Sequence, residues 1–400
     1  MSIVSSHAPR MHEDPYEREI LVDPYPFFDR LRGAGPAAWL EQYGVHAFGR
    51  DAEVRAILED YRTFISGAGV GIVNIHHAPP LRQPGILEVD PPNHTSMRAA
   101  MTSVINPKNM RSLRAGFQEF ADELVTRVID LGSFDAVSDF AEVYPLRVFA
   151  DAVGIPREGR AENLIPQGAA NFATFGPLNE IALEHRNDAE GTYEWVLQNC
   201  ARERLDPTGM GAGIWAEADA GNIPPEEATL LVRAMLSAGL DTTVIALGNT
   251  LRALAAHPDQ YARVHENPRL MKFAIDEAFR YDSPFQSFYR TTSVDTELGG
   301  IALPAESKVL LFIGSANRDE AKWGPTAADF DIDRDSSGHL TFGMGIHQCV
   351  GQPISRLEMD VLLTTFAKRV KRIEFTGDVK PFVHTTLKGY ASLPVSIDAA

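Results

Sequence analysis

One cysteine in this chain of 400 residues lies in a glycine-rich segment spanning residues 342–351. Gly343 and Gly345 precede Cys349, so the backbone can pass close to a flat group beside the sulfur. A helical run begins directly afterwards, near Pro353, and the amide groups at a helix start favour a thiolate over a thiol. This setting is typical of a metal-bound cysteine. The alternative is a structural cysteine buried in a turn, which is common for free thiols.

A second group of chemically active residues interrupts a long apolar run. The helical pattern is expected to extend over residues 224–258, and Gly239, Asp241 and Thr242 lie inside it. Glycine within a helix costs about 1 kcal/mol relative to alanine, and Asp and Thr compete for backbone hydrogen bonds. Such breaks of local rules are expected at functional sites. Ala238 and Gly239 leave room for a flat cofactor, Asp241 is a candidate proton relay, and Thr242 is a candidate to hold water. A kink without chemistry is the alternative.

Two further residues are spaced for a common task. His94 and Arg98 are four residues apart after the Pro91-Pro92 pair, so a helix presents both on one face. Two donors on one face suit an anionic pair, although an ordinary surface pair has the same spacing.

The pattern Phe-x-x-Gly-x-His-x-Cys-x-Gly at residues 342–351 resembles the haem-ligand loop of the cytochrome P450 superfamily. Ala-Gly-x-Asp-Thr-Thr at residues 238–243 resembles that family's oxygen-activation motif, in which an acid and an alcohol deliver protons. The resemblance implies haem b held by Cys349 as iron ligand, with Asp241 and Thr242 as catalytic residues. It implies further haem contacts from nine residues: His94, Arg98, Ala238, Gly239, Arg290, Phe342, Gly343, His347 and Gly351.

The resemblance also implies the fold. It predicts a mainly α protein with a small β-rich subdomain, in which the long helix crosses over the haem. The expected organisation is an N-terminal arm at residues 1–20 and a single cytochrome P450 domain at residues 21–400. Glu277-x-x-Arg280 resembles the family's structural ion pair, with Arg334 as the expected third partner. From the residues themselves we expect a hairpin at 37–40 and 45–48, and a long loop at 66–89, which in this family roofs the substrate pocket.

Composition excludes some classes of function. The net charge of −17 and the absence of a basic run argue against nucleic acid as a partner. Two cysteines provide no disulfide framework, and the polar N-terminal stretch contains no apolar segment of the kind that anchors a protein in a membrane. We therefore expect a soluble, cytoplasmic protein that is monomeric.

Among relatives, three runs resemble the bacterial para-substituted benzoate O-demethylases: residues 171–177, 237–243 and 342–352. The resemblance predicts an aromatic slot and a carboxylate-binding end, formed by Arg82, Phe172, Phe175, Ala234, Phe285 and Phe288. Arg82 lies one residue from the expected register, and Ala234 replaces a serine whose hydroxyl would bind the carboxylate. A neutral methoxyphenol of the guaiacol or syringol type is therefore the rival to 4-methoxybenzoate, because a buried carboxylate without enough donors is costly.

No flavin or nicotinamide fingerprint occurs in the chain, so its electrons are expected from a [2Fe–2S] ferredoxin and a flavin-dependent NAD(P)H reductase. Candidate docking residues for an acidic ferredoxin are Arg98, Lys108, Arg111, Arg114 and Arg356. Two other classes stay open: a peroxide-driven peroxygenase, which the intact pair of Asp241 and Thr242 disfavours, and a haem sensor or carrier without turnover.

Overall fold

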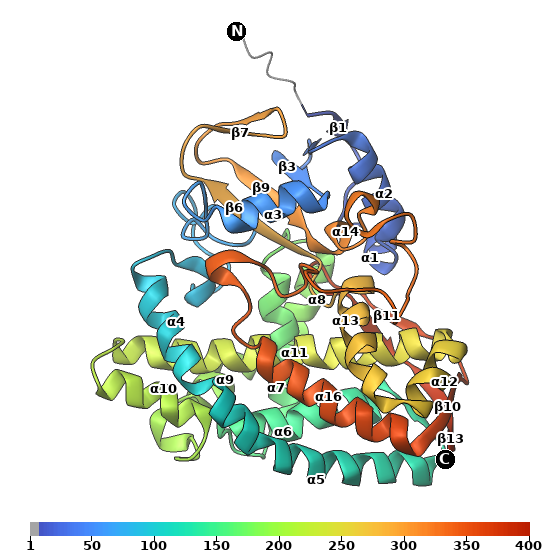
Figure 1. Cartoon of the computed structure of the whole chain (residues 1–400). Helices are drawn as coiled ribbons and strands as arrows, with labels where there is room; N and C mark the ends of the chain where they lie inside the picture. Colours follow the sequence, from blue (N-terminus) through green and yellow to red (C-terminus); the bar gives the residue numbers. More distant parts are fainter. Residues whose placement is uncertain (1–7) are drawn as a thin grey trace.

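The structure is a computed structural model, and it describes residues 8–400 of the chain. Figure 1 shows a mostly helical body with the largest sheet gathered at one end. This confirms the expected mainly α fold with a small β-rich part. The helices are α1 (Arg18–Val22), α2 (Tyr25–Ala34), α3 (Asp51–Glu59), α4 (Asn93–Val104), α5 (Pro107–Leu131), α6 (Val143–Val153), α7 (Arg160–Ala173), α8 (Glu180–Asp188), α9 (Thr192–Asn199), α10 (Met210–Asp219), α11 (Pro225–Ala256), α12 (Pro258–Glu266), α13 (Met271–Tyr281), α14 (Ile313–Ala316), α15 (Glu320–Trp323) and α16 (Gln352–Arg369).

The largest sheet has six strands in the order β1-β2-β3-β9-β6-β4. The predicted hairpin is confirmed, since β2 and β3 pair antiparallel with Trp39 opposite His46. Strand β6 carries Phe288 and Arg290 two residues apart, so both side chains leave the same face of the sheet. The strands are β1 (Arg10–Met11), β2 (Ala38–Leu40), β3 (Val45–Phe48), β4 (Phe64–Ile65), β5 (Ser133–Asp135), β6 (Ser287–Thr292), β7 (Thr296–Leu298), β8 (Ile301–Leu303), β9 (Lys308–Phe312), β10 (Val370–Phe375), β11 (Lys380–Phe382), β12 (Gly389–Ser392) and β13 (Pro394–Ala399).

The N-terminal segment is more ordered than a loose arm. Strand β1 pairs in parallel with β2, with Arg10 opposite Trp39. Tyr16 is buried, and its hydroxyl lies 2.7 Å from the hydroxyl of Tyr289. A strand pairing and a buried tyrosine therefore hold part of the expected arm to the sheet. Residues 1–7 of the predicted arm lie outside the described residues.

Helix α11 crosses the helical body and contacts α6, α7, α10 and α13 (Figure 1). It begins with Pro225, Glu226 and Glu227, which suit a first turn because proline lacks an N–H group and acids complement the helix dipole. Its 32 residues, Pro225–Ala256, fall within the helical pattern predicted for residues 224–258. Within residues 8–400, α11 alone is long and apolar enough to cross a membrane, but 61% of its most apolar window is buried inside the protein. That burial is typical of a core helix.

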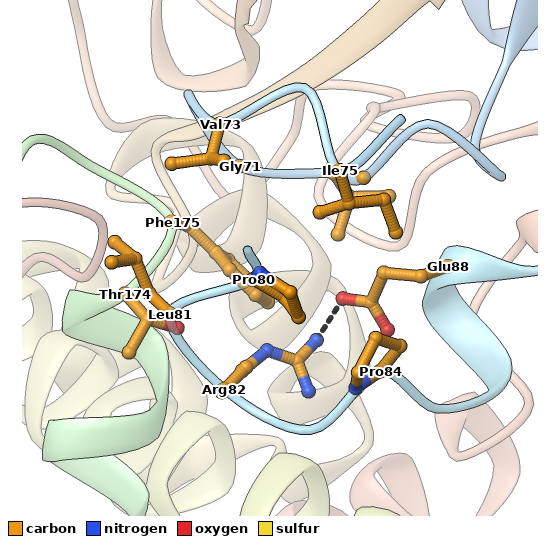
Figure 2. A pocket seen from close by; sticks show the side chains of 12 residues that line it. Gly71, Val73, Ile75, Pro80, Leu81, Arg82, Pro84, Glu88, Thr174 and Phe175 are labelled. Carbon is orange, nitrogen blue, oxygen red and sulfur yellow. Dashed lines mark hydrogen bonds and ion pairs between the residues drawn. The ribbon is translucent and has the colours of Figure 1, made fainter. Parts of the chain in front are cut away.

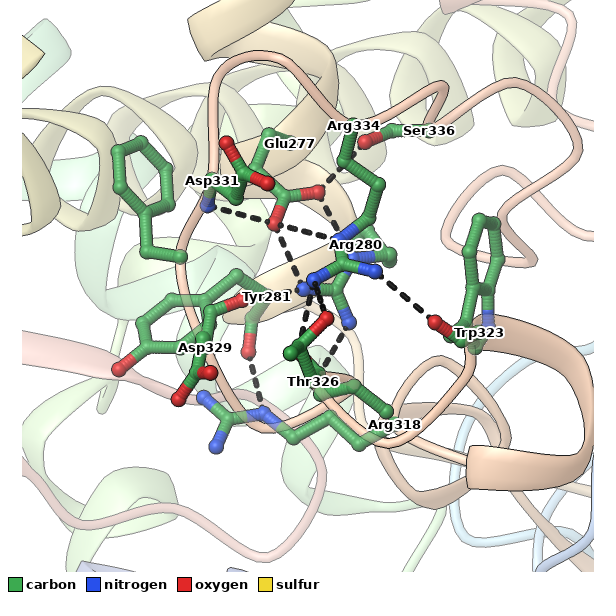
Figure 3. A network of polar contacts seen from close by, with 12 residues as sticks. Glu277, Arg280, Tyr281, Arg318, Trp323, Thr326, Asp329, Asp331, Arg334 and Ser336 are labelled. Carbon is green, nitrogen blue, oxygen red and sulfur yellow. Dashed lines mark hydrogen bonds and ion pairs between the residues drawn. The ribbon is translucent and has the colours of Figure 1, made fainter.

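A buried ion-pair network surrounds Glu277 on α13 (Figure 3). Arg280 donates from Nη2 to Oε1 of Glu277 at 2.7 Å and from Nε to Oε2 at 2.8 Å. The Nε atom of Arg334 lies 3.3 Å from the same Oε1 atom. The Asp331 N–H group and the Ser336 hydroxyl also donate to this carboxylate, at 3.0 and 2.5 Å. The predicted triad of Glu277, Arg280 and Arg334 is thus present.

Arg280 extends this network toward the segment that carries Cys349. It donates to the carbonyl oxygens of Asn317 at 2.9 Å, Ala327 at 2.7 Å and Asp329 at 2.8 Å. These carbonyls all belong to the irregular chain that precedes the cysteine loop. One buried side chain therefore determines the path by which the backbone reaches that loop.

Replacing Arg280 with methionine tests this role. The Arg280→Met substitution leaves the Glu277 carboxylate buried with fewer partners, and we expect the free energy of unfolding to fall by about 3–5 kcal/mol. Denaturant titration measures this loss of stability, and the dependence of the unfolding free energy on denaturant concentration should stay unchanged. The control is Arg263→Met, which breaks an exposed pair with Asp333. Equal effects of the two substitutions would contradict the assignment.

Candidate active site

Cys349 lies in the loop that precedes α16. Its N–H group donates to the carbonyl oxygen of Phe342 at 2.8 Å, which closes the loop. Gly345 has a φ of +70°, and a Cβ atom there would collide with the carbonyl oxygen of Leu58 at the end of α3. Only glycine fits both the conformation and the space. The loop is therefore pressed against α3, with the cysteine side chain directed into a cavity.

The protein surrounds the Cys349 sulfur but leaves it open to this cavity. Burial raises the pKa of the thiol, while the Gly351 N–H group, Arg98 and the Gln352 N–H group act to lower it. The net shift is upward. The helix start thus contributes in the predicted direction but does not outweigh burial. A metal cation beside the sulfur would reverse this balance, because a coordinating thiol is deprotonated.

The cavity separates α11 from the cysteine loop, and the empty space here amounts to about 1690 Å³ when the part open to solvent is included. Ala234, Ala238 and Thr242 recur every four residues along α11, so they form one small-sided stripe on its wall. Small residues opposite a thiol fit a flat macrocycle such as haem. The facing wall comprises five predicted haem contacts or ligands from the loop: Phe342, Gly343, His347, Cys349 and Gly351.

Three further predicted haem contacts line the cavity close to His347 of the loop: His94, Arg98 and Arg290. The rings of His94 and His347 have centroids 4.2 Å apart, and Arg98 donates to the carbonyl of Gln348. Burial lowers the pKa of Arg290 to about 10. Nowhere in residues 8–400 does an acid form an ion pair with Arg98 or Arg290, and the buried Nε2 atom of His347 has no hydrogen-bond partner. These donors fit the two propionates of haem.

Thr242 and Asp241 lie on different sides of α11. Thr242 lines the cavity, and its hydroxyl donates to the carbonyl oxygen of Ala238 at 2.6 Å. Asp241 does not line the cavity; its carboxyl packs against Gly168 of α7. Burial raises the pKa of Asp241 well above its ordinary value. The structure therefore brings the alcohol to the predicted site and places the acid behind it.

Gly239 has a second use that its sequence context does not indicate. A Cβ atom there would lie 2.8 Å from Cε1 of Phe149 and closer still to Cζ. The glycine thus makes room for the ring of Phe149, which reaches the cavity from α6. Gly239 itself also lines the cavity, as expected for a residue beside a flat cofactor, so the ring fills only the place that a side chain at Gly239 would take.

Three of the four predicted phenylalanines form the aromatic end of the cavity. The rings of Phe285 and Phe288 stack with centroids 4.0 Å apart, and Phe172 meets Phe285 edge-on at 5.4 Å. Phe175 lies behind them, 5.8 Å from Phe172, and lines a smaller pocket under the loop at residues 66–89. Phe175 therefore supports the aromatic wall from outside the main cavity.

Arg82 reaches both pockets but already has a partner. Figure 2 shows its guanidinium directed at the carboxylate of Glu88, with which it forms an ion pair. The guanidinium also lies 4.9 Å from the ring centroid of Phe175. Most of the charge of Arg82 is thus balanced within the protein, which reduces its value as an anion receptor.

Arg233 is a cavity residue that sequence reasoning missed. It is 5% exposed, donates to the carbonyl oxygen of Gln83 at 3.0 Å and to the hydroxyl of Tyr193 at 3.2 Å, and has no acidic partner within the described chain. Ala234 beside it offers only a methyl group. The available signal was a basic residue in the apolar run of α11 between Glu227 and Asp241. Arg233 is the free cation at the end of the cavity near Arg82.

Comparison with known proteins agrees with these features. The profile of the family described as Cytochrome P450 matches residues 212–389. Cytochrome p450 CYP199A2 from Rhodopseudomonas palustris is 44% identical over 98% of this chain and 95% of its own length. The 6-deoxyerythronolide B hydroxylase of Saccharopolyspora erythraea is 30% identical over 77% of each chain. The structure of cytochrome P450 CREJ with (4-ethylphenyl) dihydrogen phosphate superposes with a TM-score of 0.84 at 25% identity, covering 96% of this chain and 99% of that one.

Proposed function

This chain belongs to the cytochrome P450 family of haem-thiolate monooxygenases, and from that premise we propose that it O-demethylates or hydroxylates a small aromatic acid such as 4-methoxybenzoate. The observation that carries the proposal is the cavity itself, with Cys349 at one wall, the Thr242 stripe opposite, and an aromatic slot that leads to a free arginine. Haem b, when bound by Cys349, supplies activation of O₂.

The aromatic end suits a benzene ring. Stacked and edge-on phenylalanines bind a flat ring through dispersion and quadrupole contacts, and Phe172, Phe285 and Phe288 have this arrangement. Arg233 supplies a charged donor for an anionic head group. The CREJ complex offers a parallel, because its ligand is a para-substituted phenyl ring that carries an anion.

In this proposal the chain's residues orient the substrate and hold protons. Arg233 would bind the carboxylate, so that the para-methoxy group points toward Cys349. The Thr242 hydroxyl, which lines the cavity and donates to the carbonyl oxygen of Ala238, would pass on a proton, and Asp241 stores another behind it. Oxidation replaces one methyl C–H bond by C–OH, and the resulting hemiacetal separates into a phenol and formaldehyde. The other oxygen atom of O₂ leaves as water, which takes up two protons and two electrons, and the electrons come from the ferredoxin.

One observation favours a neutral methoxyphenol as second candidate. Arg82 is paired with Glu88, and Ala234 provides no hydroxyl. The carboxylate end therefore depends on Arg233 alone for a free charge, and a guaiacol-type substrate would not need it.

The proposed electron donor has a matching surface. A groove beside the start of α16 is lined by Arg111, Arg114, Lys272 and Arg356. Arg114 pairs with Asp360 and Arg356 with Asp276, which leaves Arg111 and Lys272 free for an acidic ferredoxin. Of the other docking candidates, Lys108 does not line this groove, and Arg98 lines the haem cavity. The free state of both cysteines supports action in the reducing cytoplasm, where we also expect a monomer.

The CO complex of the reduced, haem-loaded protein tests thiolate ligation. We expect a red-shifted Soret band for the wild type, because a thiolate donates charge to the iron. Cys349→His should bind haem and show an unshifted band. Cys200→Ala, which removes the other cysteine, should keep the shifted band. An unshifted wild-type spectrum would refute the haem-thiolate assignment.

The role of Arg233 is tested by substrate-induced spin-state titration. Loss of a charged hydrogen bond costs about 1.5–3 kcal/mol, so Arg233→Met should raise the Kd of 4-methoxybenzoate by about 10- to 100-fold. The Kd of guaiacol should change little, and Arg252→Met on the same helix is the matched control. A wild type that binds guaiacol or syringol more tightly than the benzoate would favour the neutral substrate. Failure of every methoxyarene would end the O-demethylase proposal.

Charge reversal tests the ferredoxin groove. Arg111→Glu and Lys272→Glu should each raise the KM for a [2Fe–2S] ferredoxin by about ten-fold at low salt, since steering contributes this much to association. The effect should shrink as salt screens the charges. Arg186→Glu, on exposed α8, is the control. Unchanged reduction rates in both groove variants would exclude this surface.

A further inference from the structure

Asp241 is buried without a partner. It is 6% exposed, and neither carboxyl oxygen has a hydrogen-bond donor among residues 8–400. Burial is the main cause of its raised pKa, and the nearby charge of Glu142 acts in the same direction. A carboxyl group in such surroundings keeps its proton at neutral pH. The side chain is thus a stored acid one residue from Thr242.

The carboxyl of Asp241 packs against Gly168 on α7. A Cβ atom at Gly168 would overlap Oδ2 and Cγ of Asp241 and would lie 2.7 Å from Oδ1. Gly168 is inside the helix and has no positive φ, so its backbone does not require glycine. Glycine at such a position costs about 1 kcal/mol relative to alanine. The remaining reason for glycine here is the space that Asp241 occupies.

Helix α7 is held firmly at this point. His384 lies 2.9 Å from the carbonyl oxygen of Ala169, and the Thr386 hydroxyl donates to that of Phe172 at 3.1 Å. Phe172 follows Gly168 by four residues, so both lie on one face of α7. The Phe172 ring lines the cavity, and Gly168 makes room for the Asp241 carboxyl. A single anchored helix thus positions both groups.

We propose that Gly168 is a positioning residue for Asp241: the notch that it leaves in α7 receives the carboxyl and sets its orientation. This inference rests on the proposed monooxygenase function, in which Asp241 supplies a proton. Displacing the carboxyl from the notch would spoil proton delivery without touching the haem or substrate contacts.

The test compares Gly168→Ala with Gly116→Ala in the haem-loaded protein. Gly116 is also inside a helix, and a Cβ atom there meets nothing within 4 Å. The infrared carbonyl band of a protonated acid, assigned by its loss in Asp241→Asn, should shift in Gly168→Ala and stay in place in Gly116→Ala. Product formed per O₂ consumed should fall by about ten-fold in Gly168→Ala only, because small misplacements of reacting groups cost up to about a hundred-fold.

Thermal unfolding tests the contact independently of turnover. Gly168→Ala should lower Tm when Asp241 is present and should not lower it in an Asp241→Ala background, where the notch is empty. If Gly168→Ala alone does not fold, rescue by Asp241→Ala supports the contact, and failure of the double variant overturns it. An unshifted band, or no protonated Asp241 in the wild type, also overturns the inference. These readouts decide the question even if the wild type demethylates none of the substrates above.

Discussion

The geometry of the cysteine loop depends on a buried carboxylate that is remote from it in sequence. Glu277 accepts hydrogen bonds from Arg280 and Arg334, and Arg280 in turn binds three carbonyl groups of the chain that approaches the loop. Buried charges are tolerated only when they are paired and hydrogen-bonded, so few alternative paths are available to this irregular segment. Because α13 also packs against α11 and α16, the network relates the position of the Cys349 thiol to the helix that faces it.

The arginines around the cavity fall into two groups, those that form an ion pair with an acid of the protein and those that do not. Arg82 is balanced by Glu88, and Arg280 by Glu277. Arg290 and Arg233, at separate parts of the cavity wall, have no acidic partner in residues 8–400. Since a buried and unpaired charge is costly, such residues mark where an anion completes the site. On this reasoning one part suits the propionates of the cofactor, and the other suits a substrate carboxylate.

The features that the sequence predicted well are those that depend on local sequence patterns. The hairpin, the long helix and the spacing of the Glu277 pair are properties of short segments. What the sequence did not reveal are contacts between distant segments: Tyr16 against Tyr289, Phe149 beside Gly239, and the pairing that occupies Arg82. Arg233 was missed because its position is off the stripe of α11 that faces the cavity, and only its long side chain reaches the site.

Ala234, Ala238 and Thr242 lie at fixed distances from one another along the cavity wall, because they belong to one helix. Ala234 and Thr242 are eight residues apart, which corresponds to about 12 Å at 1.5 Å per residue. Inserting one residue between Ala234 and Ala238 would turn the first part of the helix by about 100° and carry Arg233 with it. The spacing along the helix between Arg233 and Thr242 is therefore fixed by helix geometry. The cavity can be adapted to a longer or shorter substrate only by changing the side chains that line it, since inserting or deleting a residue rotates the helix as well as changing its length.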